Sequence, residues 1–354
     1  MEKTMTYRDR IATGRDINEL TRNCYKLLES DAVSIPSRNG DCRSLYEFTY
    51  RLTDPMKRHL NLAGRKSNIF QLIGETIWVL SGSGKVTGYL ETLMPRAPLY
   101  SDDGQVWRAA YGPRLYQYNQ LQDVVKFFER DGKMTRRAVV SIFFPEYDTF
   151  TQLEKVGLDD SKDFSCNNLM YFYVTPDDRF HLKVTNRSND SVFGQGINIT
   201  EFSVIQELVY LKVKQIHPEL TLGDLTISSN NYHAYDSTFE QVVAVNNEKQ
   251  REYEEFETKP LMDPSLLSFD DLKDTFAAFI DQCEDYANWD PIFQKHQIFK
   301  SSGDYQLGDY LELTERYFMT KRGITAPPLD IRRYQEDLKL AIINSPFRKF
   351  DITV

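Results

Sequence analysis

The sequence lacks the features that mark several classes of protein. Among its 354 residues are only four cysteines (Cys24, Cys42, Cys166 and Cys283), and none of them forms a CxxC pair. Such isolated cysteines argue against a zinc site and favour free thiols in a reducing cytoplasm. No amino-terminal apolar run resembles a signal peptide, and no stretch is long enough to span a membrane. We therefore predict a cytoplasmic protein with no bound metal and no membrane partner.

An excess of basic charge is also missing. The chain has 43 lysines and arginines against 52 aspartates and glutamates, which gives a net charge of -9. A general nucleic-acid binder would show a basic face, so we expect no nucleic-acid partner, although local basic clusters can still hold a small anion. Apolar residues make up 41% of the chain, enough for the core of one large domain or two ordinary ones.

Hydrophobic periodicity predicts an alternation of helices and strands before residue 245. Helical spacing of apolar residues occurs at 68–80, 121–130 and 199–216. Strand-like runs occur at 44–52, 138–144, 170–174 and 225–229. Beyond about residue 245 the chain becomes rich in glutamate, and helical patterns follow at 266–287, 308–320 and 330–344. These patterns predict two parts, residues 1–245 and a mainly helical extension, residues 246–354.

The stretch from Cys166 to Asn198 collects groups of the kind that chemistry needs. A lone cysteine is more often an inert packed thiol, but the polar neighbours of Cys166 argue against an apolar core around it. An arginine and an acid follow in Arg187-Ser188-Asn189-Asp190, and Gly194 and Gly196 allow a ligand close to the backbone. Asn198 precedes the helix at 199–216, either as an ordinary helix cap or as an amide that reads a ligand. The stretch therefore predicts a nucleophile beside an anion site.

Three arginines outside this stretch are further candidates for an anion site. Arg38 lies on the turn-rich loop 36–41 and is either a solvated surface arginine or an anion ligand. Arg136 and Arg137 open a strand, either for solubility or as a clamp of two guanidinium groups that stay charged at any working pH.

Glu75, His233 and Tyr235 are candidates because of their positions. Glu75 lies inside the apolar helix 68–80, where a carboxylate is costly unless it points outward, is paired or takes part in catalysis. His233 and Tyr235 stand two residues apart on an extended segment, so both side chains face one side and could meet one ligand.

Taken in order, these motifs resemble the thymidylate synthase family over about residues 15–242. The resemblance implies an α+β fold, a mixed sheet with flanking helices, here followed by the helical extension. It assigns catalysis to Cys166 as nucleophile, with Glu75, Tyr111 and Asp190. It assigns nucleotide binding to Arg38, Arg136, Arg137, Arg187, Ser188, Asn198, His233 and Tyr235, and folate binding to Asp190, Gly194 and Arg65.

The resemblance also implies a mechanism and partners. The Cys166 thiolate adds to C6 of a pyrimidine deoxynucleoside monophosphate, so that C5 can attack the one-carbon unit of the co-substrate 5,10-methylenetetrahydrofolate. Arginines close to the thiol, Arg187 above all, favour the thiolate. Arg136 and Arg137 resemble the pair that reaches into the partner subunit's active site, which implies a homodimer.

The chain departs from the family pattern around the folate. The loop 94–104 has no tryptophan, Ser165-Cys166-Asn167 replaces Pro-Cys-His, and Ser229-Asn230-Asn231 replaces Gly-Gly-Asp. The extension at 246–354 replaces a short carboxyl terminus that closes over the folate in the family. Loss of groups that shield the folate favours water over hydride, so we predict a nucleotide hydroxymethylase, a branch that suits a phage making modified DNA bases.

The base and the rival functions follow from the same residues. The amide of Asn198 can donate to O4 and accept from N3–H of uracil, whereas a carboxylate would suit cytosine, so we predict dUMP as the substrate. The alternatives are a thymidylate synthase proper, a dCMP hydroxymethylase, or an inactive family member that binds nucleotide or RNA as a regulator. The retained Cys166, Glu75 and arginines count against the last. The extension is alternatively a partner-binding module.

Overall fold

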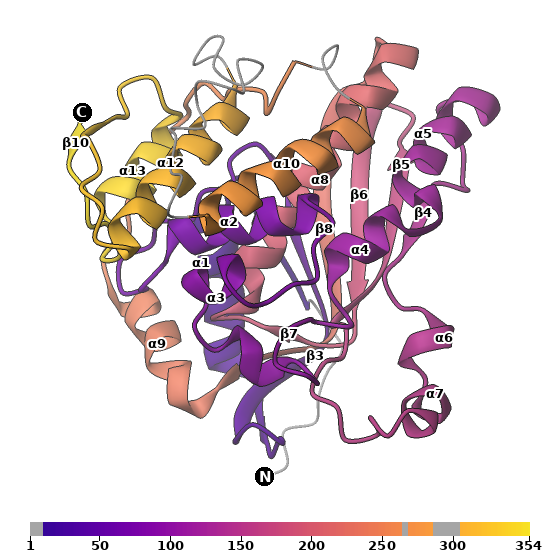
Figure 1. The fold of residues 1–354 in the computed structure, drawn as a ribbon, viewed down its shortest axis with the longest axis horizontal. Helices are drawn as coiled ribbons and strands as arrows, with labels where there is room; N and C mark the ends of the chain where they lie inside the picture. Colours follow the sequence, from indigo (N-terminus) through magenta and orange to yellow (C-terminus); the bar gives the residue numbers. More distant parts are fainter. Residues whose placement is uncertain (1–9, 264–267, 286–304) are drawn as a thin grey trace.

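The computed structural model describes residues 10–263, 268–285 and 305–354, and it is built around one mixed sheet (Figure 1). The sheet has eight strands in the order β1-β3-β8-β6-β5-β4, with β2 added to β3 and β7 to β8. Strand β8 runs antiparallel to β3 and parallel to β6, which confirms the predicted mixed sheet. The strands are β1 Ile11–Gly14, β2 Val33–Ile35, β3 Cys42–Leu52, β4 Val139–Ser141, β5 Asn167–Val174, β6 Arg179–Asn186, β7 Asn189–Asp190 and β8 Thr221–Tyr235, and a separate parallel pair joins β9 Leu329–Asp330 to β10 Ile352–Thr353.

The two faces of the sheet differ in what covers them. One row of paired residues across five strands is fully buried, and it consists of Val140, Met170, Val184, Ile227 and Tyr50. The adjacent row points to the opposite face and is exposed or half-buried except at Thr226; it consists of Val139, Tyr171, Lys183, Thr226 and Arg51. Because successive side chains of a strand point to opposite faces, only one face of the sheet supports the core of this chain.

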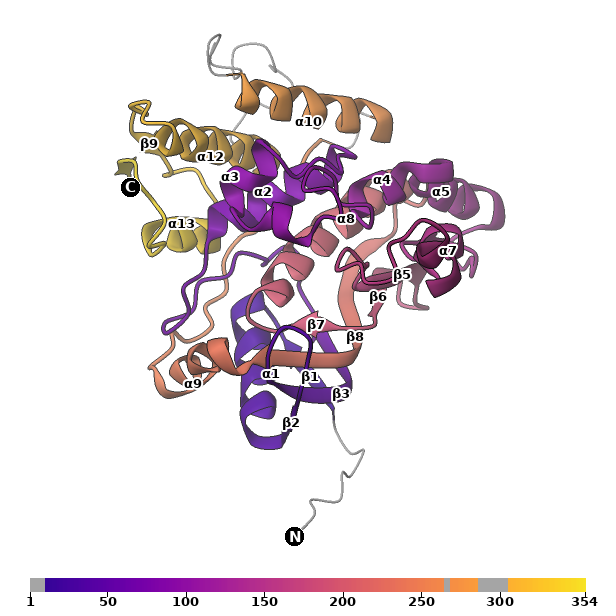
Figure 2. The same ribbon diagram turned by 60° about the horizontal axis from the view of Figure 1, so that its bottom comes forward.

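Helices cover the buried face in layers (Figures 1 and 2). Helix α8 packs on β6 and β8, α2 packs on α8, and α10 and α12 pack on the far side of α2. The helices are α1 Ile17–Asp31, α2 Ile69–Leu80, α3 Tyr89–Leu93, α4 Tyr111–Tyr116, α5 Gln120–Asp131, α6 Pro145–Asp148, α7 Phe150–Lys155, α8 Gly194–Ile216, α9 Phe239–Asn247, α10 Phe269–Glu284, α12 Gln306–Lys321 and α13 Glu336–Ile343.

Helix α2 confirms the predicted helix at 68–80 and is buried on almost every side. Asn68 caps it by accepting a hydrogen bond from the backbone N–H of Gln71, as a side-chain oxygen does at many helix starts. Its position between α8 and α10 explains why polar and apolar residues of this helix are buried alike. Glu75 is 7% exposed, so the alternative in which it points to solvent is wrong.

Helix α8 begins earlier than its apolar pattern indicates. The sequence predicted a start at residue 199, whereas the helix starts at Gly194, so Asn198 lies one turn inside and is not the helix cap. The carboxylate of Asp190 accepts the backbone N–H groups of Val192 and Phe193, which satisfies donors just before the helix begins. The predicted strand at 138–144 is also shorter, because only Val139–Ser141 pair with β5.

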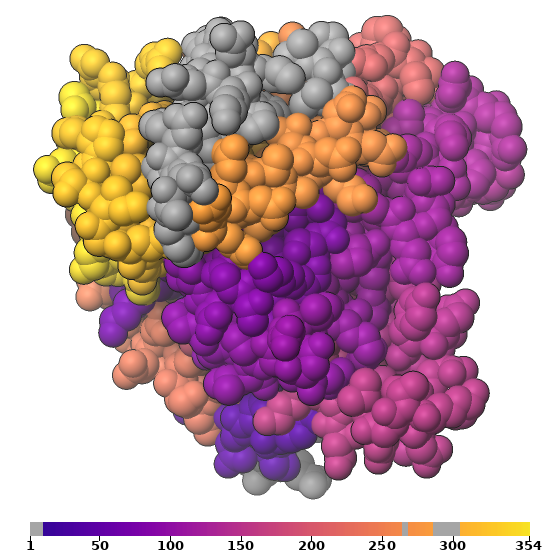
Figure 3. Space-filling model, viewed as in Figure 1, coloured from indigo at the N-terminus to yellow at the C-terminus, as the bar shows by residue number. Residues whose placement is uncertain are grey.

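The chain beyond residue 245 shares the core of the preceding part. In the described residues of this tail, α10 and α12 bury apolar side chains in the same hydrophobic cluster as α2 and the sheet. Figure 3 shows this orange and yellow part lying directly against the purple part that carries α2. Within the described ranges, no helix combines the length and apolar character that crossing a membrane requires.

Three consecutive basic residues, Lys57, Arg58 and His59, join the tail to the body, and we call them the basic triplet. Lys57 donates to Tyr253 and pairs with Glu255. Arg58, fully buried, pairs with Glu207 of α8, and Glu207 also accepts the backbone N–H of Leu261. His59 lies 2.7 Å from the Tyr310 hydroxyl and 2.9 Å from a carboxylate oxygen of Asp337. Removing one partner of a buried ion pair such as Arg58–Glu207 leaves the other charge unpaired in the core and costs about 3–5 kcal/mol.

Candidate active site

One cavity of about 460 Å³ brings together all four predicted catalytic residues. Its walls come from α2, the start of α4, the segment just before β5, the start of α8 and the end of β8. The predicted residues that line it are Glu75, Tyr111, Cys166, Asp190, Gly194, Asn198 and Tyr235. These residues are spread over 160 positions in the sequence, between residues 75 and 235, and meet only because α2 and α8 stack on the sheet.

Cys166 lies immediately before β5, where the chain enters the sheet with its thiol at the cavity wall. Burial raises the pKa of this thiol above its ordinary value, and the guanidinium of Arg187 opposes that rise. An amino group of Arg187 is 3.8 Å from Sγ, while the same guanidinium donates to the carbonyl groups of Phe164 and Ser165. The structure therefore places a half-buried thiol next to one fixed cation, the arrangement by which a thiolate is stabilised.

Glu75 lines the same cavity from α2, and its carboxyl stays protonated to a higher pH than an ordinary glutamate. Burial raises the pKa of this carboxyl to about 7, and a hydrogen bond of 2.6 Å from the side-chain amide of Gln71 to Oε1 only partly offsets the rise. A carboxyl that titrates near neutral pH can both give and take a proton under working conditions.

The amide of Asn198 is held in one orientation by two other asparagines. Its Nδ2 donates to Oδ1 of Asn189 at 3.2 Å, and its Oδ1 accepts from Nδ2 of Asn167 at 3.4 Å. Asn189 is held by the Tyr50 hydroxyl and Asn167 by Asn186. Since an amide has two N–H groups and two acceptor lone pairs, Asn198 keeps one of each for a ligand.

Of the predicted sugar and phosphate residues, Tyr235 alone lines the cavity, whereas His233, Arg38 and Arg187 contact residues at or next to its wall. The rings of His233 and Tyr235 are 5.1 Å apart and perpendicular, which confirms that they face one side. The Tyr235 hydroxyl accepts from Asn39 at 3.4 Å, and Asn39 also lines the cavity. The neighbouring Arg38 is exposed and reaches the Ser161 carbonyl at 3.4 Å. Arg38 and Arg187 therefore both attach to the segment 161–166 that leads to the thiol.

Other predicted residues do not line this cavity. Arg136 and Arg137 are both exposed, and Arg137 pairs with Asp131 at 2.6 Å. Ser188 is half-buried outside the lining. Arg65 donates to the hydroxyl of Tyr25 and the carbonyl of Val192, so it fixes the backbone beneath α8.

Gly196 also has a packing role instead of the predicted approach to a ligand. A Cβ at this position would lie 3.1 Å from Leu60 and 3.5 Å from Arg65, and Gly196 is absent from the residues that line the cavity. Gly194 does line it, and a Cβ there would lie 3.0 Å from Oδ1 of Asn189. Of the two glycines, only Gly194 has its backbone at the site.

Several residues that line the cavity were not predicted as site residues from the sequence. The rings of Trp78 and Trp107 form a perpendicular pair with centroids 5.6 Å apart, and Arg96 lies 4.3 Å from the ring centroid of Phe193. Although the loop 94–104 has no tryptophan, the cavity has flat aromatic walls. They are supplied by Trp78 of α2 and by Trp107. Glu201 was missed as well, although its position three residues after Asn198 indicates the same face of a helix.

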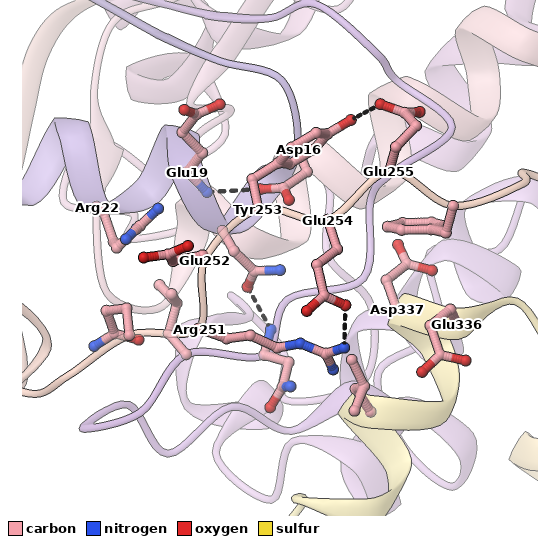
Figure 4. A pocket seen from close by; sticks show the side chains of 16 residues that line it. Asp16, Glu19, Arg22, Arg251, Glu252, Tyr253, Glu254, Glu255, Glu336 and Asp337 are labelled. Carbon is pink, nitrogen blue, oxygen red and sulfur yellow. Dashed lines mark hydrogen bonds and ion pairs between the residues drawn. The ribbon is translucent and has the colours of Figure 1, made fainter.

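A second, smaller pocket of about 180 Å³ lies between α1, the segment 250–256 and α13 (Figure 4). Its carboxylates outnumber its arginines; Arg251 pairs with Glu254 at 2.6 Å, and Tyr253 donates to Glu255. Such a lining repels phosphate and folate carboxylates, which makes the larger cavity the candidate active site. In the part of the chain that the structure describes, no group of three or more His, Cys, Asp or Glu is placed to hold a metal ion.

Comparisons with known proteins agree with this geometry. The thymidylate synthase family model matches residues 38–295. The chain is 35% identical over 340 residues to a deoxyuridylate hydroxymethyltransferase of Delftia phage PhiW-14, covering 90% of each chain, and 25% identical to a thymidylate synthase of Francisella tularensis, covering 62% of this chain and 81% of the relative. Among solved structures, thermostable thymidylate synthase A from Bacillus subtilis superposes with a TM-score of 0.56 at 17% identity, over 72% of this chain and 93% of that one.

Proposed function

The chain belongs to the thymidylate synthase family, and from that premise we propose that it hydroxymethylates deoxyuridylate at C5. The observation that carries this proposal is the cavity in which the Cys166 thiol, the Asn198 amide and the Glu75 carboxyl meet. The similarity over 90% of each chain to a phage deoxyuridylate hydroxymethyltransferase supports the same product. Deoxyuridylate, 5,10-methylenetetrahydrofolate and water would give 5-hydroxymethyl-deoxyuridylate and tetrahydrofolate.

Cys166 is the proposed nucleophile. Addition of Sγ to C6 of the pyrimidine gives C5 enolate character, and C5 then attacks the one-carbon unit that the folate supplies. Because burial raises the pKa of Cys166, the resting group is the thiol, and Arg187 at 3.8 Å stabilises the thiolate as it forms. Tyr111, whose pKa is also raised by burial, and Glu75 are the proposed partners for proton transfer in the same cavity.

Asn198 is the proposed base reader. Its fixed orientation leaves one N–H for O4 of uracil and one lone pair for N3–H, whereas cytosine presents an amino group and an unprotonated N3. This is why deoxyuridylate is favoured over deoxycytidylate. His233 and Tyr235 are the proposed ligands of the sugar hydroxyl, and Ser188 is a further proposed nucleotide contact.

Arg38 and Arg187 would bind the nucleotide phosphate from within one subunit, and Arg136 and Arg137 from a partner. The exposure of Arg136 and Arg137 outside their own cavity supports this role in trans. The uncovered face of the sheet, with Tyr171, Lys183 and Arg51 in one row, supports a homodimer formed through that face.

The folate would lie against the aromatic wall of the cavity. Trp78, Trp107 and Phe193 offer flat surfaces that suit a pterin ring, and Asp190 and Gly194 remain proposed contacts. Arg65 could act only indirectly, by holding the Val192 carbonyl. The division at residue 245 also remains a proposal, in which the extension supports α2 from behind and so holds Glu75 in place.

The test is the identity of the folate product. Incubation with deoxyuridylate and 5,10-methylenetetrahydrofolate should give tetrahydrofolate and the hydroxymethyl nucleotide. Dihydrofolate with thymidylate would instead establish the second candidate, a thymidylate synthase proper, which the aromatic wall and the thymidylate synthase relatives favour. Covalent trapping of Cys166 by 5-fluoro-deoxyuridylate with the folate separates both from an inactive regulator, and a Cys166→Ala variant is the control.

A further inference from the structure

Glu201 is a second buried carboxyl in the active-site cavity. It lies on α8, three residues after Asn198, is 3% exposed and lines the cavity. Within the described residues, its Oε2 is fully buried and has no hydrogen-bond partner. A buried carboxylate normally has partners, as Glu207 on the same helix does: it pairs with Arg58 and accepts the backbone N–H of Leu261.

Leaving a buried polar group without a hydrogen-bond partner destabilises the fold, so packing alone gives no reason for a glutamate here. Burial and, after it, the nearby Glu75 raise the pKa of Glu201 well above its ordinary value. Among the titratable groups near this pair, Arg96 lowers the pKa of Glu75, and the phenols of Tyr111 and Tyr89 interact with Glu201 and Glu75 respectively. Two interacting carboxyls in one buried cavity cannot both be ionised easily, so together they retain a proton.

Resting on the hydroxymethyl transfer proposed above, we propose that Glu201 is a second acid–base group of the reaction: together with Glu75 it holds the water that adds to the one-carbon unit and takes up its proton. Glu75 reaches the cavity from α2 and Glu201 from α8, so a water between them would be held from two sides. The free oxygen of Glu201 is available for such a bond, since no protein group occupies it in the described structure.

The step balances without a further reactant. When tetrahydrofolate has left, the nucleotide carries an exocyclic methylene at C5 and the Cys166 thioether at C6. The water oxygen forms a bond to the methylene carbon, and one water proton passes to the carboxylate of the pair. The electron pair of the exocyclic double bond moves to C5–C6, and the C6–S bond breaks with its electrons on Sγ. No oxidant or reductant is consumed, in contrast to hydride transfer, which would leave dihydrofolate.

The test separates the early steps from the addition of water. Deoxyuridylate tritiated at C5 releases tritium once C5 has been deprotonated, whereas the hydroxymethyl nucleotide reports the later step. In Glu201→Gln we expect tritium release to fall by no more than a few-fold and hydroxymethyl product to fall about 10²-fold, as for loss of a general base. Added 2-mercaptoethanol should capture the accumulated methylene as a thioether. Glu201→Asp keeps a carboxyl and should recover part of the product.

Glu207→Gln is the matched control, because it removes a buried carboxyl from the same helix outside the cavity. It should lower the melting temperature and leave the ratio of product to tritium release unchanged. Parallel loss of tritium release and product in both Glu201 variants, or an unchanged ratio in Glu201→Gln, would overturn the role of Glu201. Formation of thymidylate and dihydrofolate by the wild-type enzyme would instead overturn the proposed function, which the Glu201 variants alone cannot do.

Discussion

Replacing Asn198 with aspartate is the sharpest test of how the base is recognised. The substitution keeps the shape of the side chain and exchanges its N–H₂ group for an oxygen. That oxygen would face Oδ1 of Asn189 across 3.2 Å, so a hydrogen bond becomes a contact between two acceptors. Towards the ligand, the donor for O4 of uracil disappears. A carboxyl instead accepts from the amino group of cytosine and, in its protonated form, donates to N3.

The size of the effect follows from the burial of the site. Asn198 is 6% exposed, so water does not compensate for a lost partner. Each unsatisfied group costs about 1–3 kcal/mol, and loss of the donor for O4 together with the repulsion at Asn189 gives ~2–4 kcal/mol. At about 1.4 kcal/mol per factor of ten, kcat/KM for deoxyuridylate should fall roughly 30- to 1000-fold. The preference for deoxycytidylate relative to deoxyuridylate should rise by at least about 10²-fold.

The assay is a competition between the two nucleotides with a limiting amount of folate, read by product ratio. Asn186→Asp is the control, because Asn186 stands at the far end of the same asparagine chain and does not line the cavity. It should disturb stability without reversing the preference. A folded Asn198→Asp enzyme that still prefers deoxyuridylate to the wild-type extent would refute recognition through this amide.

Three other perturbations follow from the same structure. Because burial raises the pKa of Glu75 to about 7, the folded state favours the protonated carboxyl, and this contribution is lost as pH rises from about 4.5 through 7. Glu75→Gln should therefore gain up to ~3 kcal/mol over wild type between pH 5 and 8 while losing activity, and an equal stability difference at both pH values in thermal melts would contradict it. Mixing inactive Cys166→Ala subunits with inactive Arg136→Ala/Arg137→Ala subunits should restore about a quarter of wild-type activity if the arginines act in trans, and no recovery despite mixed dimers would contradict this. A chain cut after residue 245 loses the cover of α2 and the partners of His59, so it should show no cooperative unfolding, and a folded, active truncation would contradict that reasoning.

The spacing of apolar residues within a segment was enough to predict the helices and strands, but not which of their side chains are buried by other elements. The helix at 68–80 was predicted almost to the residue, since apolar spacing and the Asn68 cap are properties of the segment itself. Whether Glu75 points inward depends on α8 and α10, which cover opposite sides of α2 and are distant in sequence. Gly194 and Asn198 show the same limit, because a helix buried on most sides has no apolar stripe that reveals where it starts.

The site was predictable where a motif carried the chemistry. Cys166, Asp190, Asn198 and Tyr235 could be placed together from their family resemblance, and the structure brings them to one cavity. The asparagine chain that orients Asn198 joins residues from β5, β6, β7 and α8, so no single stretch indicated it. Glu201 lacked a motif altogether, and only its helical spacing from Asn198 offered a signal.

The basic triplet has a consequence for the order in which the protein is made. His59 is separated from Asp337 by 278 residues, and at about 5–20 residues per second a ribosome needs roughly 15–60 s to synthesise that interval. Until α12 and α13 have been made, His59 lacks its partners Tyr310 and Asp337, and the side of α2 that α12 covers stays open. The native core can therefore close completely only late in translation or after release.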